Sequence, residues 1–309
     1  MAWQPVTTPK NIGPRVDRNH AISVWLLATV LTSSAAILTR YCHLPATSIG
    51  FWRVFGAALV LAPWWFMAWR NAGRPPVLSL GSTLAGFFLG LHFATWAWAL
   101  QHATIANAML FIGLQPLMAP FLARPLLGER LNRWELVACL LACAGMVTIL
   151  GRQLTTDRGQ LPGSIVAFVS AALCACYFVF TRKYRPQQQA MLFTVPVYLV
   201  AAGVQAVAGF ALDGRIGVGD TGTKLALLGL ILFPTVGGHT LAIYLLRHVK
   251  SQMVTLSIPA QFVLGTTAAV FLFGEKPSAW LIAGAVMVLG GVVLGVQKSG
   301  DASPPPAES

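Results

Sequence analysis

The chain has 309 residues, of which 56% are apolar and only 10% are charged, and its mean hydropathy is +0.68. This composition excludes an ordinary soluble domain, in which about 25% of residues are charged. A net charge of +12 would suit nucleic acid as a partner, but the positions of the charges indicate membrane topology instead. We therefore expect a membrane protein that has no nucleic-acid partner.

Ten stretches are long and apolar enough to cross a bilayer, which takes about 20 helical residues for roughly 30 Å of hydrocarbon. The first is too long for the core of a signal peptide and is expected to remain in the protein. The segments 1–19 and 298–309 are predicted to be solvated tails, and we expect both to be cytoplasmic. The predicted spans are 20–40, 47–69, 79–100, 104–126, 132–150, 162–182, 190–212, 223–246, 251–274 and 278–297.

The second span contains Arg53, the only permanently charged residue well inside a predicted span. It lies about five residues from the outer end, which is about 8 Å deep at roughly 1.5 Å per residue. A long side chain can cover that depth, so we favour snorkelling or a structural ion pair. The alternative is a positive field for a substrate carboxylate at the outer mouth.

One face of the third span carries polar and aromatic side chains. His92, Thr95 and Trp96 follow helical spacing and share a face with Ala99. This stripe could stack an aromatic ligand and hydrogen-bond its amino or carboxyl group, whereas the structural alternative is plain core packing. An ionisable residue within a span suggests a function, and the indole beside it could stack a ligand. His92 and Trp96 are therefore candidate substrate-binding residues.

A glutamine lies near the middle of the fourth span (Gln115) and of the ninth (Gln261), each close to a proline, Pro116 or Pro259. An amide must be hydrogen-bonded in hydrocarbon, so both side chains should point into protein or water. Helix–helix hydrogen bonding, typically worth about 0.6–2 kcal/mol, and cavity lining remain equal alternatives. Each proline frees a backbone carbonyl one turn earlier, which bends the helix or offers a ligand an acceptor.

The eighth span is predicted to be interrupted, because Pro234 is followed by Gly237, Gly238 and His239. Segments broken by glycine or proline are good sequence indicators of a transporter site, so His239 is a further candidate. Polar candidates on the fourth, ninth and sixth spans are Asn107, Ser257 and Tyr177.

An internal duplication is visible at a constant offset of 146 residues, without a gap, between Leu100–Val147 and Leu246–Val293. Five spans per copy would force the two copies into opposite orientations in the membrane. Duplicated membrane proteins are usually transporters, with the substrate site where the repeats meet. The matching pairs include His102 and His248, Gln115 and Gln261, Trp134 and Trp280, and Gly145 and Gly291.

The turn Gly128-Glu129-Arg130 recurs as Gly274-Glu275-Lys276. Asn132 and Ser278 follow these turns and are good N-cap residues for the fifth and tenth spans. A nearby carboxylate suits the positive helix end, so we expect a structural role for Glu129 and Glu275 rather than a catalytic one.

Basic residues predict the orientation of the chain. With the N-terminus inside, fourteen of the 21 Lys and Arg residues fall in cytoplasmic segments and six on the opposite side, with Arg53 left inside a span. The positive-inside rule therefore places both termini in the cytoplasm.

The five-plus-five spans and the repeated pattern of Gln115, Gly128-Glu129-Arg130, Trp134 and Gly145 resemble the EamA-type drug/metabolite transporter superfamily. The run Phe51-Trp52-Arg53 adds to this resemblance, which covers residues 20–297. Within the superfamily the chain is most similar to aromatic amino-acid exporters of bacterial inner membranes.

The resemblance implies an all-α membrane protein of ten transmembrane helices, arranged as two inverted five-helix repeats at 20–150 and 162–297. These would surround a central cavity lined mainly by the first, third, fourth, sixth, eighth and ninth spans. Aromatic and other neutral amino acids, and related small amphiphiles, would be exported through it by alternating access.

None of the nine carboxylates lies in the central part of a predicted span, where proton- and sodium-coupled carriers commonly keep one. Only His92 and His239 could carry a proton there at physiological pH, which favours a facilitator. The same absence disfavours polycationic drugs, although export of organic cations or of another metabolite is the main alternative. Phosphorylated substrates would need several buried cations, and the spans contain only Arg53.

An intramembrane enzyme is disfavoured because the spans contain no metal-binding carboxylate pair and no nucleophile with a base. The five cysteines are interpreted as small hydrophobes in apolar helices, so neither a metal site nor a disulfide is predicted. We expect no catalytic residues and no cofactor. The expected partners are a small-molecule substrate and the lipid bilayer, and the oligomeric state is left open.

Overall fold

The computed structural model describes residues 18–151, 158–184, 189–273 and 278–298, and every regular element in these ranges is helical. The first half contains α1 (Arg18–Ser33), α2 (Ala35–Arg40), α3 (Ala46–Asn71), α4 (Leu80–His102), α5 (Ile105–Ile112), α6 (Gln115–Leu127) and α7 (Arg133–Leu150). The second half contains η2 (Arg158–Gln160), α8 (Leu161–Tyr184), α9 (Ala190–Asp213), α10 (Thr221–Leu230), η4 (Ile231–His239), α11 (Thr240–Leu245), α12 (Ser251–Thr255), α13 (Ser257–Phe273) and α14 (Ala279–Lys298).

Nine helical stretches of the described chain are long and apolar enough to cross a membrane. They correspond to nine of the ten predicted spans. The ninth predicted span is not among these nine; in the described residues it is divided at Leu256 into α12 and α13, and α13 has 17 residues. The fourth is broken in the same way between α5 and α6, at Gly113 and Leu114.

Proline explains where the new helix begins after each break. Pro116 lies three residues after Gly113, and Pro259 lies three residues after Leu256. Proline has no N–H to donate, so it is tolerated in the first turn of a helix, where backbone N–H groups have no intrahelical partner. The two prolines therefore lie in the first turn of α6 and of α13, where they are compatible with the start of a new helix.

The outside of the bundle is apolar, as expected for a surface in contact with lipid. In α1 the side chains of Leu26, Leu27 and Val30 are all more than half exposed, and only 17% of the apolar window in that span is buried. Such a continuous apolar surface is disfavoured in water. It fits the acyl-chain region of a bilayer, where the backbone polar groups are satisfied within each helix.

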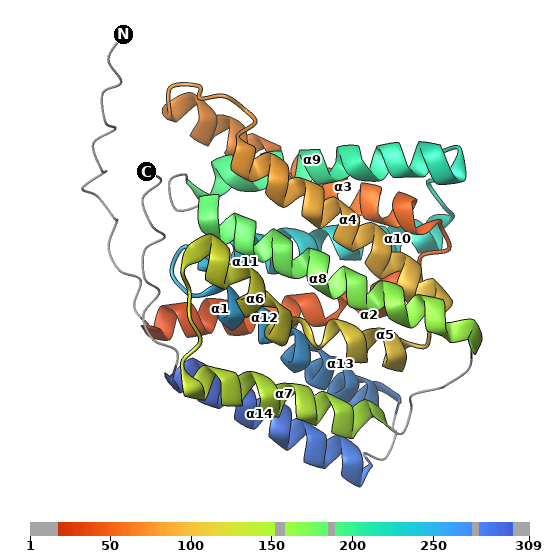
Figure 1. Ribbon diagram of the computed structural model, residues 1–309. Helices are drawn as coiled ribbons and strands as arrows, with labels where there is room; N and C mark the ends of the chain where they lie inside the picture. The colour runs from red at the N-terminus through yellow and green to blue at the C-terminus, as the bar shows by residue number, and fades with distance from the viewer. Residues whose placement is uncertain (1–17, 152–157, 185–188, 274–277, 299–309) are drawn as a thin grey trace.

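Figure 1 shows α7 and α14 side by side at one edge of the bundle and α3 and α9 at the opposite edge, with α4 and α8 between them. Glycines bring α7 and α14 into close contact. A Cβ atom on Gly284 would lie 2.6 Å from the carbonyl oxygen of Gly145, and one on Gly291 would lie 2.7 Å from that of Ala138. Small residues at helix crossings let membrane helices pack backbone to backbone.

Substituting Gly284 with alanine is expected to separate α7 from α14 and to destabilise the protein by about 1–3 kcal/mol, the usual effect of overpacking. The matched control is Gly203→Ala in α9, where a Cβ would meet no atom within 4 Å. Because alanine favours helix over glycine, that control should be neutral or slightly stabilising. Thermal unfolding in detergent measures both variants, and equal midpoints would contradict the close-packing interpretation.

The predicted helix caps are confirmed. The Asn132 side chain accepts hydrogen bonds from the backbone N–H groups of Trp134 and Glu135, and Ser278 accepts one from Leu281. Glu135 completes a capping box by accepting from the Asn132 backbone N–H at 2.7 Å. Glu129 forms an ion pair with Arg182 of α8, which is a structural contact with a partner other than the helix end that the sequence suggested. Glu275 lies outside the described residues.

Candidate functional site

The helices enclose a central cavity of about 90 Å³. Its wall takes residues from α1, α2, α4, α5, α8, η4, α11, α12 and α13, which belong to the first, third, fourth, sixth, eighth and ninth spans. The second span adds one residue, Arg53 of α3. These are the spans that the sequence resemblance implied, with Arg53 in addition.

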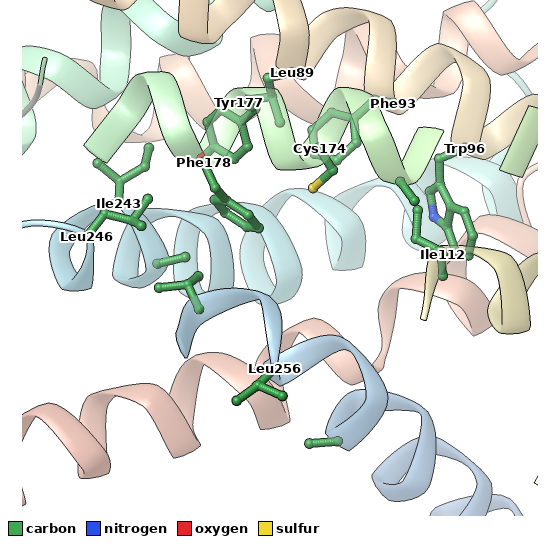
Figure 2. Close-up of a cluster of buried hydrophobic side chains, with 14 of the residues drawn as sticks. Leu89, Phe93, Trp96, Ile112, Cys174, Tyr177, Phe178, Ile243, Leu246 and Leu256 are labelled. Atoms are coloured by element: carbon green, nitrogen blue, oxygen red, sulfur yellow. The ribbon is translucent and has the colours of Figure 1, made fainter. Parts of the chain in front are cut away.

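Five of the eight candidate site residues line this cavity: His92, Trp96, His239, Ser257 and Gln261. They come from three separate parts of the chain and meet only in the folded protein. Figure 2 shows the Trp96 indole beside Ile112, another residue of the cavity wall.

His92 is anchored to α8 through Ser170. Its Nδ1 atom lies 3.0 Å from the Ser170 carbonyl oxygen and 2.9 Å from the hydroxyl, and that hydroxyl donates to the His92 carbonyl at 3.1 Å. A carbonyl only accepts, so this geometry assigns the proton of a neutral ring to Nδ1 and leaves Nε2 as an acceptor. The orientation of the His92 ring is thus fixed by Ser170, and the Nε2 lone pair remains available to a ligand at the cavity wall.

The interruption predicted in the eighth span is a π-helix, η4, and not a loop. Pro234 cannot donate a hydrogen bond, and the Thr235 hydroxyl donates to the Leu230 carbonyl at 2.7 Å. A Cβ atom on Gly237 would lie 2.6 Å from Leu31, and one on Gly238 would clash with Thr32, so both glycines let α1 pack against η4. The wider helix is a common feature of functional sites.

His239 ends the π-helix and faces aromatic rings. Its ring centroid lies 5.1 Å from that of Phe93 in an edge-to-face arrangement and 6.5 Å from that of Phe178. Its Nδ1 atom has no hydrogen-bond partner among the described residues. A buried nitrogen without a partner is unfavourable, so His239 has hydrogen-bonding capacity left for a ligand or for water.

Gln261 and Ser257 lie on the same face of α13, one turn apart. The Gln261 side-chain amide donates to the Ser257 hydroxyl at 3.0 Å, and both residues line the cavity. The pairing orients the amide without using its carbonyl oxygen.

Three candidates lie away from the cavity wall. Gln115 and Tyr177 are fully buried, and neither the Gln115 amide nor the Tyr177 hydroxyl has a hydrogen-bond partner among the described residues. In Figure 2 Tyr177 lies near Leu89 of α4, whereas Phe178 extends to the cavity side of α8. Asn107 donates to the Ser164 hydroxyl at 3.3 Å, which joins α5 to α8.

The structure overturns the prediction that Arg53 snorkels or forms an ion pair. The side chain is only 4% exposed and lines the cavity, with its Nε atom donating to the Thr235 hydroxyl at 2.8 Å. Its guanidinium carbon lies 4.0 Å above the Phe93 ring, a cation–π contact. The Arg53 side chain therefore points toward the protein interior, where it donates a hydrogen bond to Thr235, a residue 182 positions later in the chain.

The aromatic wall is more extensive than the sequence indicated. Besides Trp96, the rings of Trp25, Phe93 and Phe178 line the cavity. The Trp25 indole N–H donates to the Met253 carbonyl at 2.9 Å, which fixes α1 against α12. A pocket with apolar walls and few polar groups is typical of small-molecule sites.

None of the four carboxylates in the described chain lines the cavity. Glu129 and Glu135 form ion pairs with Arg182 and Lys250, Asp213 accepts from Thr47, and Asp220 caps α10. Groups of three or more metal-ligating side chains are likewise absent from this part of the chain. Within the described residues, the cavity wall contains one permanent cation and no anion.

A family model described as the EamA-like transporter family matches the chain twice, over residues 20–151 and 161–296. The chain belongs to this family. It is therefore a membrane transporter of the drug/metabolite transporter superfamily, as the sequence resemblance predicted. The two matches together span nearly all of the described chain.

Relatives of this chain include transporters whose names give different substrates or none. An uncharacterised transporter of Archaeoglobus fulgidus is 27% identical, covering 87% of this chain and 93% of its own. A Rickettsia felis protein named S-adenosylmethionine uptake transporter is 25% identical, covering 86% and 88%. A Salmonella typhimurium protein named probable amino-acid metabolite efflux pump is 25% identical, covering 69% and 76%.

A solved crystal structure shares the fold with a TM-score of 0.73 at 22% identity, covering 92% of this chain and 99% of its own. At this identity the likeness supports the fold alone. It agrees with the helical bundle described above.

Proposed function

We propose that this protein is an inner-membrane exporter of aromatic and other neutral amino acids and related small amphiphiles, with both termini in the cytoplasm. Ten helices in two inverted repeats would alternate access to the central cavity. The observation that carries the proposal is the cavity itself, where an aromatic wall meets a few polar groups and one cation. The relative named as an amino-acid metabolite efflux pump supports the same substrate class.

The cavity offers each part of an amino acid a matching group. Trp96, Phe93 and Phe178 supply apolar and aromatic area for a side chain. The Nε2 lone pair of His92 and the free side-chain oxygen of Gln261 can accept from an ammonium group. A neutral amino acid is a zwitterion, so it also brings a carboxylate, for which Arg53 is the one charged partner at the cavity wall of the described chain.

Transport into liposomes carrying the purified protein tests the proposal. Labelled phenylalanine, leucine, S-adenosylmethionine, glucose and an organic cation are each trapped on one side, and counterflow of the label is measured. We expect counterflow with the two neutral amino acids and little with glucose or the organic cation. Counterflow with S-adenosylmethionine alone would overturn the proposal and favour the activity named for the Rickettsia relatives.

Energy coupling gives a second prediction. Because the described cavity wall contains no carboxylate, collapsing the proton gradient should leave phenylalanine flux down its own gradient within about twofold of the control. The measurement compares liposomes with and without a protonophore. Flux that requires the proton gradient, and that is lost in a His92→Ala variant that still folds, would refute facilitation and make His92 the coupling group.

A further inference from the structure

Arg53 is buried in an unusual setting for a charged side chain. It is 4% exposed, and it reaches the cavity from about 10 Å inside the end of α3, counting from Ala46 at roughly 1.5 Å per residue. Arginine stays protonated in proteins, so its charge cannot be removed by titration near neutral pH. Removing such a charge from water is unfavourable unless something nearby compensates for it.

The compensation that the described residues provide is partial. Nε donates to Thr235, and the guanidinium plane lies over Phe93. The Thr235 hydroxyl donates its proton to the Leu230 carbonyl, so it can only accept a hydrogen bond from Arg53. This contact fixes the orientation of the guanidinium. Both ion pairs of the described chain, Glu129 with Arg182 and Glu135 with Lys250, involve other cations.

The two terminal nitrogens of Arg53 therefore remain available. No acceptor for Nη1 or Nη2 is present among the residues that the structure describes, and the side chain forms part of the cavity wall. The two N–H groups of a guanidinium edge match the two oxygens of a carboxylate. An arginine held by Nε and one face, with its fork free beside a cavity, has the geometry of an anion-binding group.

We propose that Arg53 binds the carboxylate of the transported substrate and restricts transport to compounds that carry one. This inference rests on the proposed transport of amino acids and names the group that selects them. The Phe93 ring contacts one face of the guanidinium and Thr235 accepts a hydrogen bond from Nε, so both act as positioning residues. The substrate supplies the counter-charge that the described chain lacks.

The assignment predicts a charge rule for substrates. Compounds with a carboxylate and no net positive charge complete the pairing, whereas amides, esters and organic cations without a carboxylate leave Arg53 uncompensated next to a second positive charge. S-adenosylmethionine carries a carboxylate but also a net positive charge, and no acidic side chain of the described cavity wall balances the excess. It should bind more weakly than a neutral amino acid.

Three ligands of the same ring and chain length test the rule on the full-length protein. Phenylalanine has a carboxylate and an amine, 3-phenylpropionate has only the carboxylate, and phenylalaninamide has only the amine. Their binding is measured from the concentration dependence of thermal stabilisation in detergent. We expect phenylalaninamide to bind at least roughly tenfold more weakly than the two carboxylates, since a hydrogen bond to a charged group is worth about that factor.

Arg53→Gln should weaken the binding of both carboxylate ligands by roughly tenfold. The affinity for phenylalaninamide should then lie within about threefold of that for phenylalanine. Arg53→Lys keeps the charge but loses the fork, and should retain part of the discrimination. Arg40→Gln is the matched control, because Arg40 ends α2 and donates to the Ala103 carbonyl away from the cavity. That variant should keep the wild-type order of affinities.

The outcomes separate the two proposals. If 3-phenylpropionate binds through Arg53 but phenylalanine is neither bound nor transported, the amino-acid function fails and the Arg53 assignment stands. If the wild-type protein binds phenylalaninamide as tightly as phenylalanine, or binds none of the carboxylates, the assignment is overturned. Should Arg53→Gln fail to fold, the three-ligand comparison on the wild-type protein and on Arg53→Lys still decides it.

Discussion

Replacing Arg182 with methionine is expected to lower the thermal unfolding midpoint in detergent by roughly 5–10 °C. The Arg182 side chain is 3% exposed and pairs with Glu129 at 3.1 Å, while Nη1 donates to the carbonyls of Leu246 and Arg247. Breaking a buried ion pair by removing one partner costs about 3–5 kcal/mol, because the other charge is left buried and unpaired. For a protein of this size each kcal/mol shifts the midpoint by about 2 °C.

The controls separate charge from packing. Lys183→Met removes the neighbouring cation of α8, which contacts the Tyr184 ring and forms no ion pair among the described residues, so its midpoint should move little. The double variant Glu129→Gln with Arg182→Gln leaves no unpaired charge and should recover part of the loss. A double variant less stable than Arg182→Met alone would contradict the ion-pair explanation.

The same ion pairs connect the two halves of the chain at the predicted cytoplasmic end. Glu129 also accepts from the Ser251 hydroxyl, Glu135 pairs with Lys250 at 2.8 Å, and the Asn132 side-chain amide donates to the Lys298 carbonyl at the end of α14. Any opening between the halves at this end has to separate these charges. We therefore expect this cluster to oppose such an opening.

The sequence predicted those features that depend on local chemistry. Apolar run length located the spans, since about 20 apolar residues are needed whatever surrounds them. Asn132 was recognised as a cap because its side chain serves backbone N–H groups two and three residues away. Proline and glycine indicated the irregular eighth span, but not that it would form a π-helix rather than a break.

Features that depend on distant partners were not predictable in the same way. Arg53 resembled a snorkelling arginine because its distance from the helix end is all that a single span reveals. Its actual partner, Thr235, lies in another span, and nothing in either segment alone pairs them. Likewise Glu129 meets Arg182 only through the packing of α8.

The internal repeat is informative about folds and less so about sites. Gln115 and Gln261 occupy equivalent repeat positions, yet Gln261 lines the cavity and Gln115 is fully buried behind it. The helix break at Leu114 precedes Gln115 by one residue, whereas the break at Leu256 precedes Gln261 by five, so the two glutamines occupy different positions within their helices. Equivalent positions therefore need not share a role.

Substituting Trp96 with alanine is expected to reduce transport of large apolar amino acids far more than that of small ones. The indole lines the cavity while only 7% exposed, so it presents wall area to a ligand and contributes no charge. Losing contact with about 50 Å² of ligand surface, at about 25 cal/mol per Å², weakens binding roughly tenfold. Alanine and glycine do not reach that wall and should lose less than about twofold.

Competition against labelled phenylalanine counterflow in liposomes measures the effect, with protein incorporation checked for every variant. Trp98→Ala is the matched control, because Trp98 belongs to the same helix but stacks on His102 at 3.9 Å and lies outside the cavity wall. It should leave the selectivity unchanged. Gln261→Leu should instead depress large and small substrates alike, since it removes a polar partner that every amino acid can use. A Trp96→Ala protein with wild-type selectivity would show that the aromatic wall packs the helices without contacting the substrate.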